Sequence, residues 1–195
     1  MAGGVGSILT SHQICVTSQN DDPRAGNILR AAHDLGISHL QDVTITDLIF
    51  LRGNITEETR TLVESLVVEP LLQRGQWNSE SAPADVVVET ALHPGVTDSA
   101  TTELTRLATR MSLPITGVAS GKRFALTGQL SQAQLQQLIS QLLANPIIER
   151  WSINEPITPT FIDAEAMANT NVEHVQITAN TTPQQLAQIN KTTTK

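Results

Sequence analysis

Two stretches of this sequence carry the same order of caps, turns and apolar residues at a nearly constant offset of 75 or 76 positions. The corresponding positions are Asp22 and Asp98, Leu35 and Met111, Gly53 and Gly128, Thr56 and Ser131, and Pro70 and Pro146. Repetition at one long period is typical of a duplicated structural unit. We therefore predict a tandem of two similar units, residues 12–77 and 85–154, joined by the polar linker 78–84.

Each unit contains strand and helix signals in the order β-α-β-β-α-β. In the first unit we expect a strand over 12–18, a hairpin over 40–51 that turns at Thr46-Asp47, and a short final strand from Leu71. Asp22-Pro23 and Thr56 begin its two helices, because a side-chain oxygen there accepts a hydrogen bond from a free backbone N–H.

The second unit follows the same scheme. We expect a strand over 85–89, a hairpin through Ser120-Gly121, and a closing strand over 147–153. Its helices are predicted to begin after Asp98 and Ser131, and Asn145-Pro146 ends the second of them.

This element order predicts an α+β fold made of two ferredoxin-like repeats. A four-stranded sheet with helices on one face leaves its other face or an edge strand uncovered. Two copies in one chain can cover each other, so we predict that they pack as a pseudo-two-fold dimer.

The two ends of the chain lie outside the repeat. Residues 1–11 are Gly-rich and are predicted to be a flexible tail, and residues 155–195 an extended exit followed by the start of a linker region. Within the latter, 172–179 alternates like a strand, and Thr181-Thr182-Pro183 is a helix start. That helix is cut short at Lys195, which indicates either a longer parent polypeptide or a polar tail.

Composition argues against several classes of partner. The formal net charge is −7 and the aromatics are three Phe, two Trp and no Tyr. Nucleic-acid binding relies on clustered basic residues and aromatic stacking platforms, so no nucleic-acid partner is expected. No apolar run reaches the roughly 18 residues of a membrane span, and the N-terminus lacks the features of a signal peptide. A cytoplasmic location without membrane contact is the default.

No catalytic, cofactor or metal motif stands out. The five His residues lack metal-ligand spacing, and Cys15 lies inside a predicted strand without an obvious His partner. Gly121-Lys122 lacks the earlier glycine and the following Ser or Thr of a phosphate loop. Gly121 is instead predicted to be a turn residue, with Lys122 and Arg123 an exposed basic tip that either is solvated surface or docks a partner.

The second unit resembles PurS, the small subunit of phosphoribosylformylglycinamidine synthase. The resemblance rests on Pro94-Gly95-Val96-Thr97-Asp98, on Val118-x-x-Gly121-Lys122, and on the segment 143–149 with its Asn145-Pro146. The first unit keeps Asp22-Pro23 and Gly53 but lacks the Pro-Gly-Val and Gly-Lys motifs. Together residues 12–154 resemble the fused PurS-like N-terminal domain of single-chain synthases. The segment from residue 172 is similar to the start of the linker region that follows there.

This resemblance implies a non-catalytic, structural part of a ligase. The family enzyme converts formylglycinamide ribonucleotide, ATP and glutamine to the amidine, ADP, phosphate and glutamate. The resemblance implies ATP and Mg only for the complete synthase, whose synthetase core and glutaminase would be the partners of this chain. The competing interpretation is a tandem ferredoxin-like regulatory module of the ACT type, which binds a small ligand between its repeats. An independent enzyme is a third.

Overall fold

The computed structural model describes residues 11–163 of the chain. The tail predicted over 1–11 lies outside this range except for Ser11, and so do the strand and helix predicted within 172–195.

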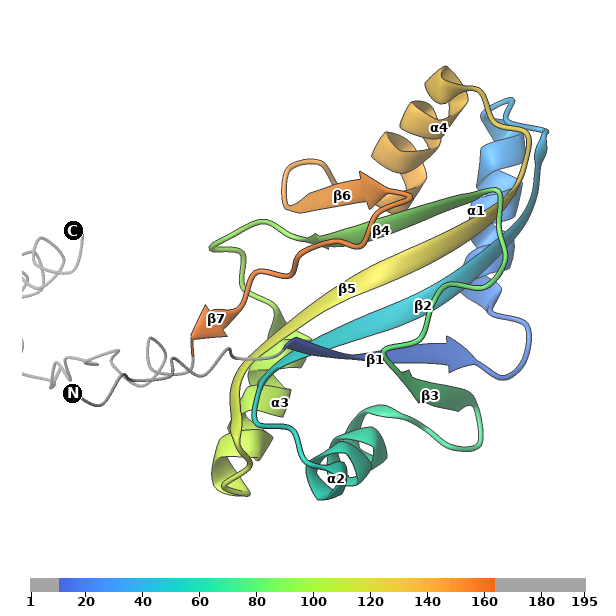
Figure 1. Cartoon of the computed structure of the whole chain (residues 1–195). Coiled ribbons are helices and arrows are strands. Elements are labelled where there is room, and N and C mark those ends of the chain that lie inside the picture. The colour runs from blue at the N-terminus through green and yellow to red at the C-terminus, as the bar shows by residue number, and fades with distance from the viewer. Residues whose placement is uncertain (1–10, 164–195) are drawn as a thin grey trace, which may run out of the picture. The chain divides into compact units, whose positions relative to one another are not determined.

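The described residues form a seven-stranded antiparallel sheet in the order β3-β1-β2-β5-β4-β6, with β7 added beside part of β5 (Figure 1). The strands are β1 Ser11–Ser18, β2 Leu40–Gly53, β3 Gln73–Trp77, β4 Val86–Leu92, β5 Ile115–Gly128, β6 Glu149–Ile153 and β7 Ile162–Asp163. The helices are α1 Pro23–Asp34, α2 Glu57–Val67, α3 Ser99–Arg110 and α4 Gln132–Leu138, the last continuing as a π-helix over Ile139–Leu143. The mixed architecture agrees with the predicted α+β class and is consistent with a ferredoxin-like PurS fold.

Two strands of 14 residues each, β2 and β5, form the middle of the sheet. They pair in antiparallel register from Leu40 opposite Gly128 to Gly53 opposite Ile115, with Asp47 opposite Lys122 near the centre. Both predicted hairpins are therefore wrong, because Thr46-Asp47 and Ser120-Gly121 lie in mid-strand. The two long strands pair with each other along their length, so neither folds back on itself.

Each half consequently runs strand, helix, long strand, helix, strand, rather than β-α-β-β-α-β. The last strand of each half also begins later than predicted. Leu71 and Ile147 lie in the turns before β3 and β6, and their side chains are 82% and 84% exposed.

The four helix starts are confirmed. Asp22 accepts a hydrogen bond from the Arg24 N–H at the start of α1, and Thr56 accepts one from the Thr59 N–H at the start of α2. Asp98 caps α3, and Ser131 forms a capping box with Gln134 at the start of α4. These contacts satisfy backbone donors that have no partner inside the helix.

Apolar side chains cover both faces of the sheet. On one face, Ile45 belongs to a buried cluster with α1 and α4, and Leu51 to a second cluster with α2 and α3. Strand side chains alternate between faces. Leu48 and Phe50 accordingly lie on the opposite face, in a third cluster that also contains Ile157 of the exit segment.

Candidate functional site at the centre of the sheet

The predicted basic tip lies in the middle of β5. A Cβ at Gly121 would approach the Thr90 carbonyl oxygen to 2.5 Å, so glycine is needed here for the close approach of β4 and not for a turn. Arg123 is buried, with 7% of its surface exposed. Of the three residues predicted on an exposed turn, only Lys122 is exposed, and it projects from a strand.

Arg123 forms a buried ion pair with Glu89 of β4. The Arg123 Nε donates to Glu89 Oε1 at 2.7 Å, and the two side chains are 9% and 4% exposed. Glu89 and Arg123 face each other in the β4–β5 register. Buried charges persist in a protein interior when they are paired and their remaining polar atoms are hydrogen-bonded.

Both partners of this ion pair also bind irregular segments of the chain. The Arg123 guanidinium donates from Nη1 to the Ser79 carbonyl at 3.0 Å, which fastens the linker between the two halves. The Ile157 N–H donates to Glu89 Oε2 at 2.8 Å, which fastens the exit segment. The pair therefore joins the linker and the exit segment to the same face of the sheet.

Cys15 lies beside this network, as a buried residue of β1 that is 2% exposed. Its Sγ lies 3.7 Å from the Ser79 carbonyl and 3.9 Å from Arg123 Nη1. The expectation that Cys15 is a small packed residue agrees with this environment.

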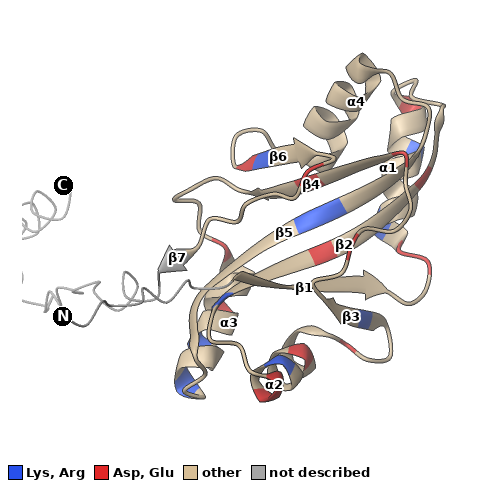
Figure 2. Cartoon of the chain, viewed as in Figure 1, with Lys and Arg blue, Asp and Glu red and all other residues tan. Residues whose placement is uncertain are grey.

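The other face carries charge at the centre of the long strands. Figure 2 shows a basic band in the middle of β5 beside an acidic band on β2. Asp47 accepts hydrogen bonds of 3.0 and 2.9 Å from Arg24, which also binds Asp22. The bond from Arg24 lowers the pKa of Asp22, and the two carboxylates raise the pKa of Arg24. Lys122, opposite Asp47 in the register, has no side-chain hydrogen bond or ion pair among residues 11–163.

The other residues of the family motif make turns and caps. Pro94-Gly95 turns the chain between β4 and α3, with Gly95 at φ +85°. Asp98 caps α3 and also accepts a hydrogen bond from the Ser120 hydroxyl of β5. Asn145, before Pro146, accepts from the Ile147 N–H at 3.1 Å and orders the turn into β6. These motif residues therefore occupy turn and cap positions of the backbone.

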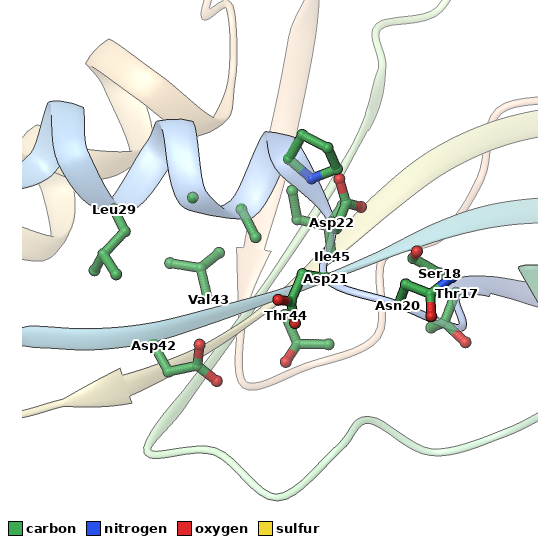
Figure 3. Close-up of a pocket in the computed structure, with 13 residues that line it drawn as sticks. Thr17, Ser18, Asn20, Asp21, Asp22, Leu29, Asp42, Val43, Thr44 and Ile45 are labelled. Carbon is green, nitrogen blue, oxygen red and sulfur yellow. The ribbon is translucent and has the colours of Figure 1, made fainter. Parts of the chain in front are cut away.

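A cavity of about 530 Å³ lies beside α1 in the first half. Figure 3 shows it between the end of β1, the start of α1 and the first residues of β2. Its lining includes Asp21, Asp22 and Asp42 beside the apolar Leu29 and Val43.

Residues 11–163 show neither a metal site nor a membrane-spanning helix. No group of three or more His, Cys, Asp or Glu side chains there is placed to hold a metal ion. No helix in the same range is both long and apolar enough to cross a bilayer.

Sequence reasoning missed the Glu89–Arg123 pair. Glu89 and Arg123 lie 34 positions apart, and only the pairing of β4 with β5 brings them together. The one local signal is that each charge interrupts a mostly apolar run, since Glu89 follows Val86-Val87-Val88 and Arg123 precedes Phe124-Ala125-Leu126. A charge within a buried strand requires a partner.

Comparison with known families supports a PurS-like domain in the second half. Residues 85–155 match the PurS family model, described as phosphoribosylformylglycinamidine (FGAM) synthase. None of the curated proteins compared with the chain matches it. The family match links residues 85–155 to FGAM synthase and, through it, to purine biosynthesis.

Proposed function

We propose that this chain is a non-catalytic assembly part of FGAM synthase in purine biosynthesis. The observation that carries the proposal is the PurS match over residues 85–155. The complete enzyme would convert formylglycinamide ribonucleotide, ATP and glutamine to the amidine, ADP, phosphate and glutamate. ATP and Mg would bind to its other parts, and this chain would bridge the synthetase core and the glutaminase.

We further propose that the first half is a diverged second copy of the same unit, so that the chain imitates a PurS dimer. The order of strands and helices is the same in both halves, and the capping residues Asp22 and Asp98 stand at the same place. The β2–β5 register also supports the duplication. Asp47 and Lys122 lie 75 positions apart in the sequence, which is the repeat offset, and they lie opposite each other in the sheet. A two-fold axis between the halves would pass beside this residue pair.

Lys122 remains our proposed docking residue for a partner. Its side chain is exposed and forms no ion pair within residues 11–163, whereas Arg123 is engaged with Glu89 and Gly121 is packed against β4. A single exposed cation contributes to orientation and to association rate more than to affinity. The expected effect of its reversal is therefore moderate.

The test is reconstitution with the synthetase and glutaminase chains of the same enzyme. A stable complex with glutamine-dependent amidine formation would support the proposal. Lys122→Glu should weaken that complex without unfolding the free chain, although the new carboxylate lies opposite Asp47 and should lower the thermal midpoint slightly. Arg106→Glu, an exposed charge reversal on α3, is the matched control.

A regulatory ligand-binding module is the second candidate, and the cavity of about 530 Å³ beside α1 favours it. A chain that binds neither partner but is stabilised against heat by an amino acid or a nucleotide would support this alternative. Such a result would contradict the assembly role.

A further inference from the structure

The first half of the sheet has an open strand edge at the cavity beside α1. β1 covers β2 only from Thr46 to Arg52, and β5 pairs with the other edge of β2 along its whole length. Residues 42–45 therefore have a strand neighbour on one side only within the described part of the chain. These residues line the cavity.

The corresponding edge in the second half is occupied. β4 covers β5 only from Gly121 to Leu126, which leaves the start of β5 open on that side. There the exit segment adds β7, with Asp163 opposite Gly117 and Ile162 opposite Val118. Gly117 and Val118 stand 75 positions after Asp42 and Val43, the open edge of the first half.

The cavities of the two halves correspond in the same way. One cavity in the second half is lined by Asp98 and by 118–120, and that in the first half by Asp22 and by 43–45. Thr160 of the exit segment also lines the cavity of the second half, whose volume is only about 20 Å³. The cavity of the first half is about 530 Å³. An extended segment fills one of two similar places and leaves the other open.

We propose that the open edge at residues 42–45 binds an extended segment of a partner polypeptide, which adds to the sheet as β7 does on β5. Strand addition supplies backbone hydrogen bonds to an edge and pockets for alternate side chains. Val43 and Ile45 are buried and Leu29 of α1 flanks them, so the site has an apolar floor.

The charge of the lining specifies the partner's chemistry. Asp21 and Asp42 are exposed and form no ion pair with any residue in 11–163, and the whole chain carries a formal charge of −7. A basic side chain on the added strand would meet these carboxylates. The structure therefore favours a segment with alternating apolar or β-branched residues and at least one Lys or Arg.

Gly26 of α1 provides a direct test of this site. It lines the cavity, and a Cβ added there would meet no atom within 4 Å. Gly26→Phe should place a bulky ring at the cavity, since its Cβ has open space, and replacement of a helical glycine should not lower stability. Gly26→Ala is the matched control, because it makes the same backbone change with almost no added volume.

The probe is a synthetic peptide of about seven residues that alternates Val or Thr with Lys, a normal strand length. Binding to the full chain would be measured by fluorescence anisotropy. We expect Gly26→Phe to weaken binding by at least about tenfold and Gly26→Ala to leave it unchanged. Asp42→Asn should weaken binding about two- to fivefold, with Asp34→Asn at the far end of α1 as the control. A peptide with Glu in place of Lys, and one with alternate N-methylated residues, should both bind poorly.

Residue-resolved amide exchange identifies the occupant. In the free chain, the amides of residues 42–45 that point away from β5 should exchange rapidly, and the Lys peptide should protect them. Protection in the free chain that is independent of concentration would mean that the chain covers its own edge. Protection that grows with concentration would mean a second copy. Either result would overturn the proposal, as would peptide binding that Gly26→Phe leaves intact. None of these measurements requires the synthase partners. The proposed strand-binding site can therefore be refuted while the proposed assembly role stands, and the assembly role can be refuted while the strand-binding site stands.

Discussion

Removal of the Arg123 guanidinium should destabilise the protein strongly. Arg123→Met keeps an unbranched side chain of similar length but leaves the Glu89 carboxylate without its cation, at 4% exposure. Breaking a buried ion pair from one side costs about 3–5 kcal/mol, a large fraction of the roughly 5–15 kcal/mol by which a domain is stable. The variant also loses the hydrogen bond to the Ser79 carbonyl, which holds the linker.

The double variant Glu89→Leu/Arg123→Met distinguishes two contributions to stability: the cost of leaving one buried charge unpaired, and the net stabilisation that the ion pair provides. With both charges gone the desolvation penalty disappears, and replacement of a buried pair by apolar residues is often close to neutral. What remains is the loss of two hydrogen bonds, to Ser79 and Ile157, each worth about 1 kcal/mol. The double variant should therefore recover part of the stability that the single variant loses.

Urea unfolding at neutral pH measures both effects. The exposed pair Glu103–Arg106 of α3 is the control, since its side chains are each 67% exposed and Arg106→Met should change stability by less than about 1 kcal/mol. Amide exchange should also show that the Ile157 N–H, which donates to Glu89, becomes less protected in the double variant. If Arg123→Met costs no more than the control, the pair does not hold the linker and exit segment as described.

Three further outcomes follow from single sites. Gly121→Val should lower the thermal midpoint markedly because its Cβ would lie 2.5 Å from the Thr90 carbonyl oxygen, and a midpoint near that of the wild type would show that β4 can move away. Arg24 lowers the Asp22 pKa, so this pair stabilises the fold above the ordinary carboxyl pKa of 3.8 and loses its effect as pH falls through the lower folded value. Asp22→Asn should flatten the acid side of a stability-against-pH curve measured by urea unfolding, and an unchanged curve would contradict this. Ser131→Ala should cost about 1 kcal/mol in the same assay, and a change below about 0.3 kcal/mol would show that the capping box of α4 contributes little.

The helix starts could be predicted because they depend on residues close together in the sequence. The strand pairing could not be predicted, because it depends on residues far apart. A cap is decided by a side chain and a backbone N–H two or three residues later, as at Asp98 and Ala100. A hairpin forms only if its two arms pair with each other and not with another strand. Ser120-Gly121 has turn-forming residues, yet both its arms pair with β2, in the other half of the chain. The sequence does not distinguish a glycine that forms a turn from a glycine that allows a neighbouring strand to approach closely.

The same limit applies to the charged residues. Lys122 and Arg123 are adjacent and basic, which predicts one shared environment. Alternation along β5 places them on opposite faces, one exposed and one paired with Glu89. The open edge at Asp42 was also beyond sequence reasoning, because it depends on where β1 stops along a strand that was predicted to be a hairpin.

The continuous strands change what the two halves can be. In a hairpin arrangement, the start of β2 would pair with the end of β2, and each half would satisfy its own backbone. Here Val43 pairs with Leu126 and Leu51 pairs with Val118, so each half completes the other's sheet. Phe124 and Leu126 of the second half accordingly join Ile45 and α1 in one buried cluster. If the two halves were separated, each would expose unpaired backbone groups and apolar side chains, and both are unfavourable in water. The two halves thus complete one sheet, and within residues 11–163 the exit segment covers part of the open edge of β5 but none of that of β2.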